Sequence, residues 1–199
     1  MNVEGTDFMN ICLYGASSDK IDKTFMDETQ NLGNMMAERG HSLVYGGGAT
    51  GLKGAAARGV YEKNGKILGV APKFFSADGI LFENCTKFIY TETMRERKRI
   101  MEENADAFIV TPGGIGTFEE FFEILTLKQL GRHNKAIAVF NISGYYDIMK
   151  QMLDDAIAKD FMKENCNELY KFFDNADEMM EYIENYTGVD TKADYYKNI

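Results

Sequence analysis

The chain has 199 residues, of which 45% are hydrophobic and 27% charged, and its formal net charge is −9. This length and composition predict a single globular domain over residues 1–199, with a core at about 9–186 and a frayed polar tail at 187–199. The acidic balance excludes nonspecific nucleic-acid binding, because that function requires a basic face. We therefore expect no nucleic-acid partner.

Three cysteines, Cys12, Cys85 and Cys166, are odd in number and widely spaced, so neither a disulfide framework nor a zinc site is predicted. The N-terminus lacks a basic region followed by an apolar one, and no apolar run is long enough to cross a bilayer. We expect a reduced, cytoplasmic protein without a membrane partner or a bound metal.

Short apolar runs alternate with longer segments of helical periodicity along the chain. Strands are expected at 10–14, 42–45, 66–71, 86–90, 106–110, 135–140 and, at a sheet edge, 169–173. Helices are expected at 19–39, after the glycines of 46–51, and at 93–104, 118–130, 145–159 and 176–186. Residues 73–84 have no clear pattern. This alternation predicts an α/β fold, in which helices cover both faces of a parallel sheet.

Three loops, at 15–18, 46–51 and 112–117, follow expected strands. Ligands of such sheets bind outside the carboxyl ends of the strands, so we expect the three loops to meet there. In the third loop, Pro-Gly-Gly-Ile-Gly-Thr leaves amide groups uncovered beside a helix start, which is typical of a phosphate site. The alternative is a tight turn before a helix that Thr117 caps, with Glu120 closing a capping box.

Two nucleotide-binding motifs are incomplete in the chain. The pattern Gly46-x-Gly48-x-x-Gly51 matches the dinucleotide fingerprint, but the next strand ends without the acid that would hold a ribose. The run Gly-Leu-Lys-Gly at 51–54 is not a P-loop, which requires Gly-Lys followed by Ser or Thr. We therefore predict neither NAD binding nor ATP hydrolysis, and no cofactor.

The helix expected at 93–104 is dense in charge, which is typical of a solvated face. Its apolar residues nevertheless define one arc of the helical wheel: Met94, Ile100 and Met101. Arg97 projects into the middle of this arc, Lys98 flanks it, and Arg99 lies on another face. A charge inside an apolar arc requires a partner, because an unpaired buried charge is very costly. We expect either Glu120 or a ligand to be that partner.

The run Met-Arg-Glu-Arg-Lys at 94–98, followed by Pro-Gly-Gly-Ile-Gly-Thr-Phe-Glu-Glu at 112–120, resembles the LOG (Lonely guy) family. Its members are cytokinin riboside 5′-monophosphate phosphoribohydrolases, often mislabelled lysine decarboxylases. The resemblance runs from about residue 10 to 153 and includes 43–48 and 130–135. It implies a Rossmann-like sheet and a homodimer. It also implies hydrolysis of the N-glycosidic bond of AMP or N6-substituted AMP, giving a free base and ribose 5-phosphate.

By this resemblance Arg97 and Glu120 are the catalytic pair. The residues implied to contact the nucleotide are Met94, Lys98, Gly113, Gly114, Ile115, Gly116, Thr117, Thr126, Gly47 and Ser17. Cleavage builds positive charge on the ribose, which a carboxylate such as Glu120 can stabilise. Arg95 and Leu127 depart from the histidine and tryptophan common in plant members, so the preferred base is not predicted.

Three alternatives come from other classes of protein. A nucleotide-sensing protein would bind without turnover, although binding alone would not require the Arg97 and Glu120 pair. A pyridoxal-dependent decarboxylase would need a Schiff-base lysine and partners for the cofactor ring, and we find no motif for either. The third is a partner-binding module. Release of free adenine from AMP discriminates the enzyme from the nucleotide-sensing protein, and pyridoxal absorbance of the purified protein tests for the decarboxylase.

The helix expected at 118–130 is apolar on two sides. One stripe, suited to covering the sheet, contains Phe118, Phe121, Phe122 and Leu125, and a second side contains Ile124, Leu127 and Leu130. We expect this helix to pair with its copy about a twofold axis, which would bury the second side. The alternative is that a helix at 145–159 or 176–186 covers that side within one chain.

Overall fold

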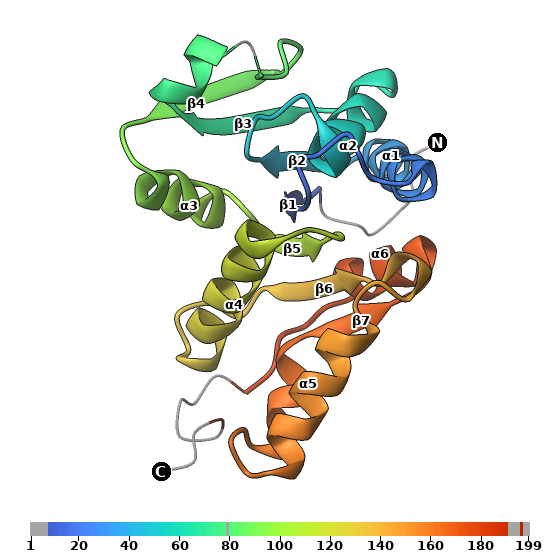
Figure 1. The fold of residues 1–199 in the computed structure, drawn as a ribbon, viewed down its shortest axis with the longest axis vertical. Coiled ribbons are helices and arrows are strands. Elements are labelled where there is room, and N and C mark those ends of the chain that lie inside the picture. Colours follow the sequence, from blue (N-terminus) through green and yellow to red (C-terminus); the bar gives the residue numbers. More distant parts are fainter. Residues whose placement is uncertain (1–7, 79, 191–195, 197–199) are drawn as a thin grey trace.

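Seven parallel strands form one sheet in the order β4-β3-β2-β1-β5-β6-β7, in a computed structural model that describes residues 8–78, 80–190 and 196 (Figure 1). The strands are β1 (Asn10–Tyr14), β2 (Ser42–Tyr45), β3 (Ile67–Pro72), β4 (Lys87–Thr91), β5 (Ala107–Val110), β6 (Ala136–Phe140) and β7 (Lys171–Phe173). The chain runs outward from β1 to β4 and then returns to build β5 to β7 on the other side of β1. The loops after β1 and β5 therefore flank the point where the strand order reverses, the usual ligand position in such sheets.

The described residues also form the α-helices α1 (Lys23–Glu38), α2 (Gly51–Glu62), α3 (Met94–Glu103), α4 (Ile115–Gln129), α5 (Asp147–Ala158) and α6 (Ala176–Glu184), of which α1 to α5 connect strands and α6 follows β7. The short 3-10 helices are η1 (Lys73–Asp78), η2 (Ile142–Gly144) and η3 (Glu164–Leu169). The predicted α/β fold with a parallel sheet is confirmed. The expected strands agree with the observed ones to within two residues, because strands buried on both faces are nearly continuous apolar runs.

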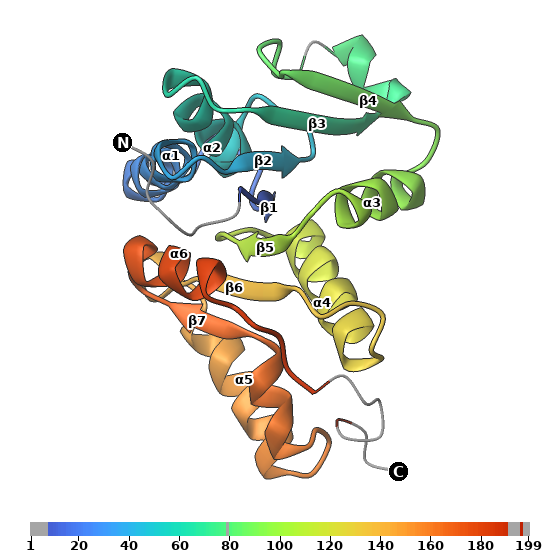
Figure 2. The ribbon, with the colours of Figure 1, turned by 180° about the vertical axis from the view of Figure 1, so that it is seen from behind.

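Two core clusters lie on the two faces of the sheet, because successive side chains of a strand point to opposite faces. Ile11 and Leu13 of β1 belong to the cluster that contains residues of α1, α2 and α6. Cys12 and Tyr14 belong to the cluster that contains residues of α3, α4 and α5. In both ribbon views α1 and α2 lie side by side on their face of the sheet (Figures 1 and 2).

The start of α4 corrects one prediction. This helix begins at Ile115 with Gly114 as its N-cap, whereas Thr117 was expected to cap it. Thr117 therefore lies within the first turn, and the alternative of a capping box between Thr117 and Glu120 is wrong. The extended backbone of Gly114, with φ of −97° and ψ of −153°, allows the chain to enter the helix three residues early. A search for capping hydroxyls cannot detect such a start.

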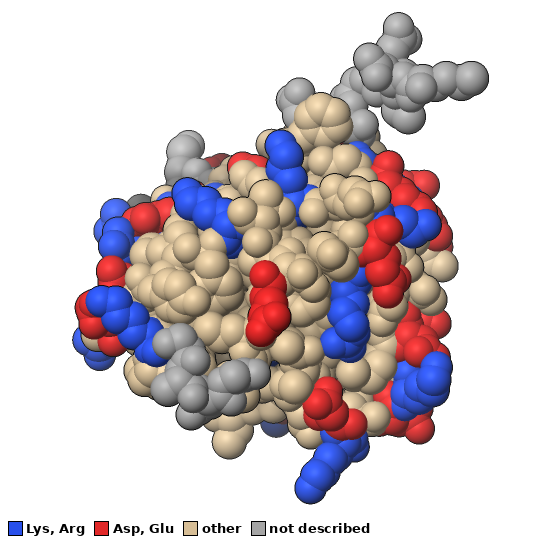
Figure 3. Space-filling view, turned by 90° about the horizontal axis from the view of Figure 1, so that it is seen from above, with Lys and Arg blue, Asp and Glu red and all other residues tan. Residues whose placement is uncertain are grey.

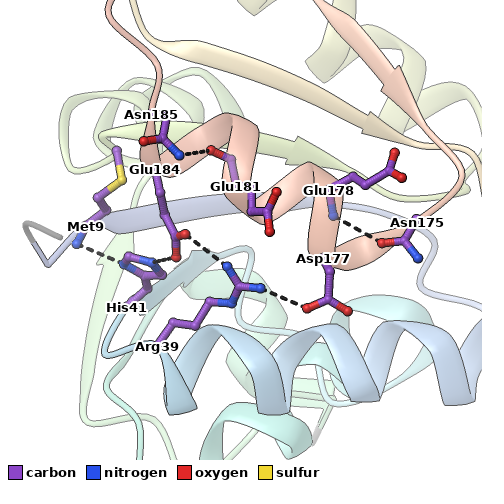
Figure 4. A network of polar contacts seen from close by, with 9 residues as sticks. All are labelled: Met9, Arg39, His41, Asn175, Asp177, Glu178, Glu181, Glu184 and Asn185. Carbon is purple, nitrogen blue, oxygen red and sulfur yellow. Dashed lines mark hydrogen bonds and ion pairs between the residues drawn. The ribbon is translucent and has the colours of Figure 1, made fainter. Parts of the chain in front are cut away.

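A partly buried polar network joins α6 to the segment between α1 and β2 (Figure 4). The His41 ring is fully buried; its Nδ1 accepts a hydrogen bond from the Met9 amide, and its Nε2 lies 2.9 Å from Glu184. The Nε2 atom must therefore carry the proton that it donates to Glu184. Arg39 pairs with Glu184 at 2.9 Å and with Asp177 at 2.8 Å. The network lies at the opposite end of β2 from the predicted ligand loops.

Three further observations concern the surface charge, the hydrophobicity of the helices and the C-terminal tail. On the face shown in Figure 3, basic and acidic side chains are interspersed and do not form a basic stripe. Among the described residues, no helix combines the length and apolar character needed to cross a membrane. Within the tail expected to fray, Tyr196 is 1% exposed and its carbonyl oxygen accepts a hydrogen bond from Gln129. Residues 191–195 and 197–199 lie outside the described part of the chain.

Candidate active site

A cavity of about 470 Å³ lies at the carboxyl edge of the sheet, where the three predicted loops meet. The amide of Ala16 donates to the carbonyl of Pro112 at 3.0 Å, and the Thr50 hydroxyl donates to the carbonyl of Ser17 at 2.8 Å. The loops after β1, β2 and β5 are thus joined directly. The cavity is lined by Gly15, Ala16, Ser17, Ser18, Gly46, Gly48, Thr50, Lys53, Phe75, Ile80, Leu81, Met94, Arg97, Gly114, Gly116, Thr117 and Glu120.

A buried ion pair between Arg97 of α3 and Glu120 of α4 forms one wall of the cavity. Nη1 of Arg97 lies 3.0 Å from Oε1 of Glu120, and Nε donates to the carbonyl of Val70 at 3.2 Å. Arg97 is 3% exposed and Glu120 is 8% exposed. The predicted pairing is confirmed. Burying both charges costs several kcal/mol of desolvation, so such a pair adds little to the stability of the fold. Its position in the cavity wall indicates a role in a ligand-binding or catalytic site.

The guanidinium group of Arg97 fits because residue 46 has no side chain. A Cβ atom added at Gly46 would lie only 1.9 Å from Nη2 of Arg97. At Gly48, two residues further along the same loop, an added Cβ would meet nothing within 4 Å. The glycine at position 46 therefore positions the arginine, which is a role that neither of the incomplete nucleotide-binding motifs suggested.

The N-terminus of α4 opens into the same cavity. Added Cβ atoms at Gly114 and Gly116 would meet nothing within 4 Å, so the backbone is uncovered on the cavity side. The first amide groups of a helix have no intrahelical acceptor and, together with the helix dipole, favour an anion. The buried hydroxyl of Thr117 packs against Gly113, where an added Cβ would lie 2.1 Å from Oγ1.

Two tyrosines that sequence reasoning missed hold this loop from behind. The Tyr145 hydroxyl donates to the carbonyl of Gly113 at 2.6 Å, and the buried Tyr146 hydroxyl donates to the carbonyl of Thr111 at 2.8 Å. They fix the backbone just before α4. No signal in the sequence marks them, since they lie more than thirty residues downstream of the loop they support.

Lys53 is another cavity residue that the sequence analysis missed, because its run was considered only as a failed P-loop. It lies in the first turn of α2 and lines the same cavity as the N-terminus of α4. Burial lowers the pKa of Lys53; the negative charge of Glu120 opposes this shift, and the positive charge of Arg97 adds to it. The sequence does contain a signal for Lys53, because a lysine in the first turn of a helix that follows a glycine-rich loop at the ligand edge is expected to lie near the ligand.

The structure brings most, but not all, of the predicted site residues together. Those that line the cavity are Arg97, Glu120, Met94, Gly114, Gly116, Thr117 and Ser17. Those that do not are Lys98, Gly113, Ile115, Thr126 and Gly47. Lys98 pairs with Glu119 and with Glu123, the latter at 2.7 Å.

The remaining residues lie on different sides of the cavity wall. Ile115 is 87% exposed, and Thr126 lies exposed about three turns further along α4. Gly47 and Gly113 are buried behind the wall. Nucleotide contacts by Lys98, Gly113, Ile115, Thr126 and Gly47 stay predictions.

Fold and cavity together define an α/β protein of Rossmann-like architecture with a buried arginine–glutamate pair at the ligand edge. Residues 53–183 match the family model described as "Possible lysine decarboxylase". Over 179 residues the chain is 35% identical to the cytokinin riboside 5′-monophosphate phosphoribohydrolase LOG2 of Arabidopsis thaliana, covering 90% of this chain and 84% of that protein. It is 32% identical over 189 residues to LOG5 of the same plant, covering 95% and 83%. The chain belongs to the LOG family.

A solved structure adds information on the fold alone. The molybdenum cofactor binding protein from the phototrophic bacterium Rippkaea orientalis is similar with a TM-score of 0.68 at 20% identity. The match covers 90% of this chain and 97% of that protein. At this identity the likeness indicates a shared architecture and does not extend to the ligand.

Proposed function

We propose that the chain hydrolyses the N-glycosidic bond of a nucleoside 5′-monophosphate, AMP or N6-substituted AMP, to the free base and ribose 5-phosphate. The observation that carries this proposal is the buried Arg97–Glu120 pair in a cavity that also receives the N-terminus of α4. The relatives support it, since their names assign phosphoribohydrolase activity on cytokinin riboside 5′-monophosphates.

Each part of the cavity supplies one requirement of this reaction. The uncovered amides at the start of α4 bind the phosphate and so hold the ribose in place. The bond from C1′ to the base breaks with its electron pair leaving on the base, water adds its oxygen to C1′, and the proton that this water loses is taken up by the base. The Glu120 carboxylate stabilises the positive charge that builds on the ribose or orients that water. Arg97 holds the carboxylate in position.

We further propose that the protein is a homodimer. The apolar surface that favours this lies between α4 and α5, in a groove of about 450 Å³ lined by Phe118, Phe122, Tyr145, Tyr146, Ile148, Met149 and Met152. Ile148 is 81% exposed and Met152 is 51% exposed, so much of this surface faces water in one chain. A second copy placed about a twofold axis would cover it.

The second side of α4 that sequence analysis assigned to the interface is partly internal. Ile124 is fully buried in the core cluster that contains Met101 of α3, so only Leu127 and Leu130 remain at least partly exposed there. The groove, rather than that side, is the larger apolar surface. The described cysteines are free thiols, which suits the reduced, cytoplasmic location that we propose.

The proposal is tested by incubating the protein with a panel of nucleoside 5′-monophosphates and the matching nucleosides, and separating the free bases. AMP should be cleaved far faster than adenosine, because the phosphate supplies binding energy away from the reacting centre. Equal rates on both would contradict the assignment of the phosphate site. Binding of every monophosphate without release of base would favour the nucleotide-sensing alternative.

A further inference from the structure

Among the lining residues that the structure describes, the cavity contains one more positive than negative side chain. These described ionisable residues are Lys53, Arg97 and Glu120. Arg97 and Glu120 neutralise each other at 3.0 Å, so the excess positive charge belongs to Lys53. This local charge is opposite in sign to that of the chain as a whole, which is −9.

The Lys53 ammonium has no hydrogen-bond or ion-pair partner among the residues that the structure describes, whereas Lys98 on α3 is held by two glutamates. A half-buried lysine without a directly bound partner is costly, and the cost falls when an anion occupies the space in front of it. The unpaired lysine is therefore a feature that a bound anion would complete.

The backbone around Lys53 is held in place. Its amide donates to the carbonyl of Ala16 at 3.3 Å, and the amide of Gly51 donates to Oδ1 of Asp19 at 2.8 Å. Gly51 has a φ of +63°, and a Cβ there would lie 2.5 Å from the oxygen of Ala16. The start of α2 is thus locked against the loop after β1, and Lys53 is directed into the cavity from a fixed position.

We propose that Lys53, in the first turn of α2, is the charged group that binds the substrate's phosphate in the cavity that the N-terminus of α4 also lines. The identity of the ligand in this inference rests on the proposed function. An ammonium group is a compact point charge with three donors, and it complements the directional amides of a helix start. Lys53 would therefore be a binding residue that distinguishes a nucleoside monophosphate from an uncharged nucleoside.

The test compares three variants of the intact protein. Lys53→Met removes the charge at nearly constant length, Lys53→Arg retains it, and Lys63→Met removes an exposed charge from the far end of the same helix. The readouts are kcat and KM for AMP, the rate on adenosine, and the Kd of ribose 5-phosphate by calorimetry. Thermal unfolding shows that each variant is folded.

We expect Lys53→Met to raise both KM for AMP and the Kd of ribose 5-phosphate by about ten-fold or more, the loss of one charge-assisted contact. Its rate on adenosine should be unchanged. Lys53→Arg and Lys63→Met should stay within about three-fold of the unmodified protein in KM and Kd. Loss of kcat at unchanged KM in both Lys53 variants would overturn the proposal, because it would indicate proton transfer by the lysine.

The outcomes also separate this inference from the proposed function. Turnover of AMP that is indifferent to Lys53→Met, with an unchanged Kd for ribose 5-phosphate, overturns the role of Lys53 and leaves the enzyme assignment intact. Ribose 5-phosphate binding that depends on Lys53, in a protein that releases no base from any monophosphate, supports the anion site and overturns the hydrolase.

Discussion

The side chains of Arg97 and Glu120 compensate each other's charge in the protein interior, because either one alone would be a buried, unpaired charge. We predict that Arg97→Ala and Glu120→Ala each lower turnover of AMP by at least about 100-fold. Removing one partner also destabilises, by about 3–5 kcal/mol. Glu120→Gln, which nearly preserves shape, should therefore lose turnover with a smaller loss of stability.

The control for this prediction is Arg99→Ala, on the same helix. Arg99 is exposed and pairs with Glu103 within α3 at 2.9 Å, so its loss should leave turnover within about two-fold. Steady-state rates and urea denaturation of all four variants separate lost chemistry from lost stability. Full turnover by a folded Glu120→Gln protein would show that the carboxylate is structural.

Gly46 and Gly48 offer a second matched pair of variants. A methyl group at position 46 would overlap the Arg97 guanidinium at 1.9 Å, whereas position 48 has open space. We predict that Gly46→Ala lowers turnover by at least about ten-fold, because small displacements of a catalytic group are costly. Gly48→Ala should remain near the unmodified rate. Equal activities in the two variants would mean that the position of Arg97 is unimportant for the reaction.

At this scale, the sequence was informative where a local pattern decides the outcome. The pairing of Arg97 could be predicted because a charge inside an apolar helical arc requires a partner, and Glu120 lies near the start of the next helix at the same sheet edge. The contacts of Tyr145 and Tyr146 could not, because hydroxyl partners more than thirty residues away depend on tertiary placement. Lys53 was missed because a motif search discards a lysine that lacks the rest of its motif.

Among the elements, α4 contributes residues both to the cavity and to the groove of the proposed subunit contact. The strands before and after it were predictable as apolar runs, but its first turn was not, since Gly114 caps it without a side chain. The segment after β3 had no periodic pattern and folds into the short helix η1 and a bridge between Gly48 and Leu81. Phe75, Ile80 and Leu81 of this region line the cavity, which no periodicity could indicate.

Substitutions in the groove between α4 and α5 test whether the protein is a homodimer. We predict that Ile148→Glu yields monomers in sedimentation velocity, because it places a charge in a surface that the partner copy would desolvate. Leu127→Glu tests the side of α4 first expected at the interface. Tyr61→Glu, on the opposite face of the sheet and about half exposed, is the control and should leave the assembly intact. A monodisperse monomer of the unmodified protein at assay concentration would contradict the homodimer.

The stability of the whole molecule should depend on pH through Lys128, which contributes a pH-dependent part of the free energy of unfolding. This side chain is 0% exposed, its Nζ donates to the carbonyl of Leu169 at 2.8 Å, and it lies 4.6 Å from the centre of the Tyr186 ring. Burial lowers the pKa of Lys128 to about 7 from its usual 10.5. Between these values the unfolded chain binds more protons, so this group's contribution to the free energy of unfolding rises with pH.

For one proton, the rise is at most about 1.4 kcal/mol per pH unit. Lys128→Met should remove this rise of the free energy of unfolding with pH. The variant should be more stable than the unmodified protein at pH 6.5, where burial of the charged lysine lowers the free energy of unfolding most. Urea denaturation of both proteins from pH 6.5 to 8.5 measures the difference, since the other titrating groups are common to both. Parallel profiles would mean that Lys128 remains charged in the folded protein.

The central claim, that this chain is a phosphoribohydrolase, is tested most directly by the stoichiometry of its products. The measurement is the amount of adenine and of ribose 5-phosphate released from AMP by the unmodified protein and by Glu120→Gln. The two products should accumulate in equal amounts with the unmodified protein and at least about 100-fold more slowly with the variant. AMP that binds but remains intact, with neither product formed over repeated preparations, would contradict it.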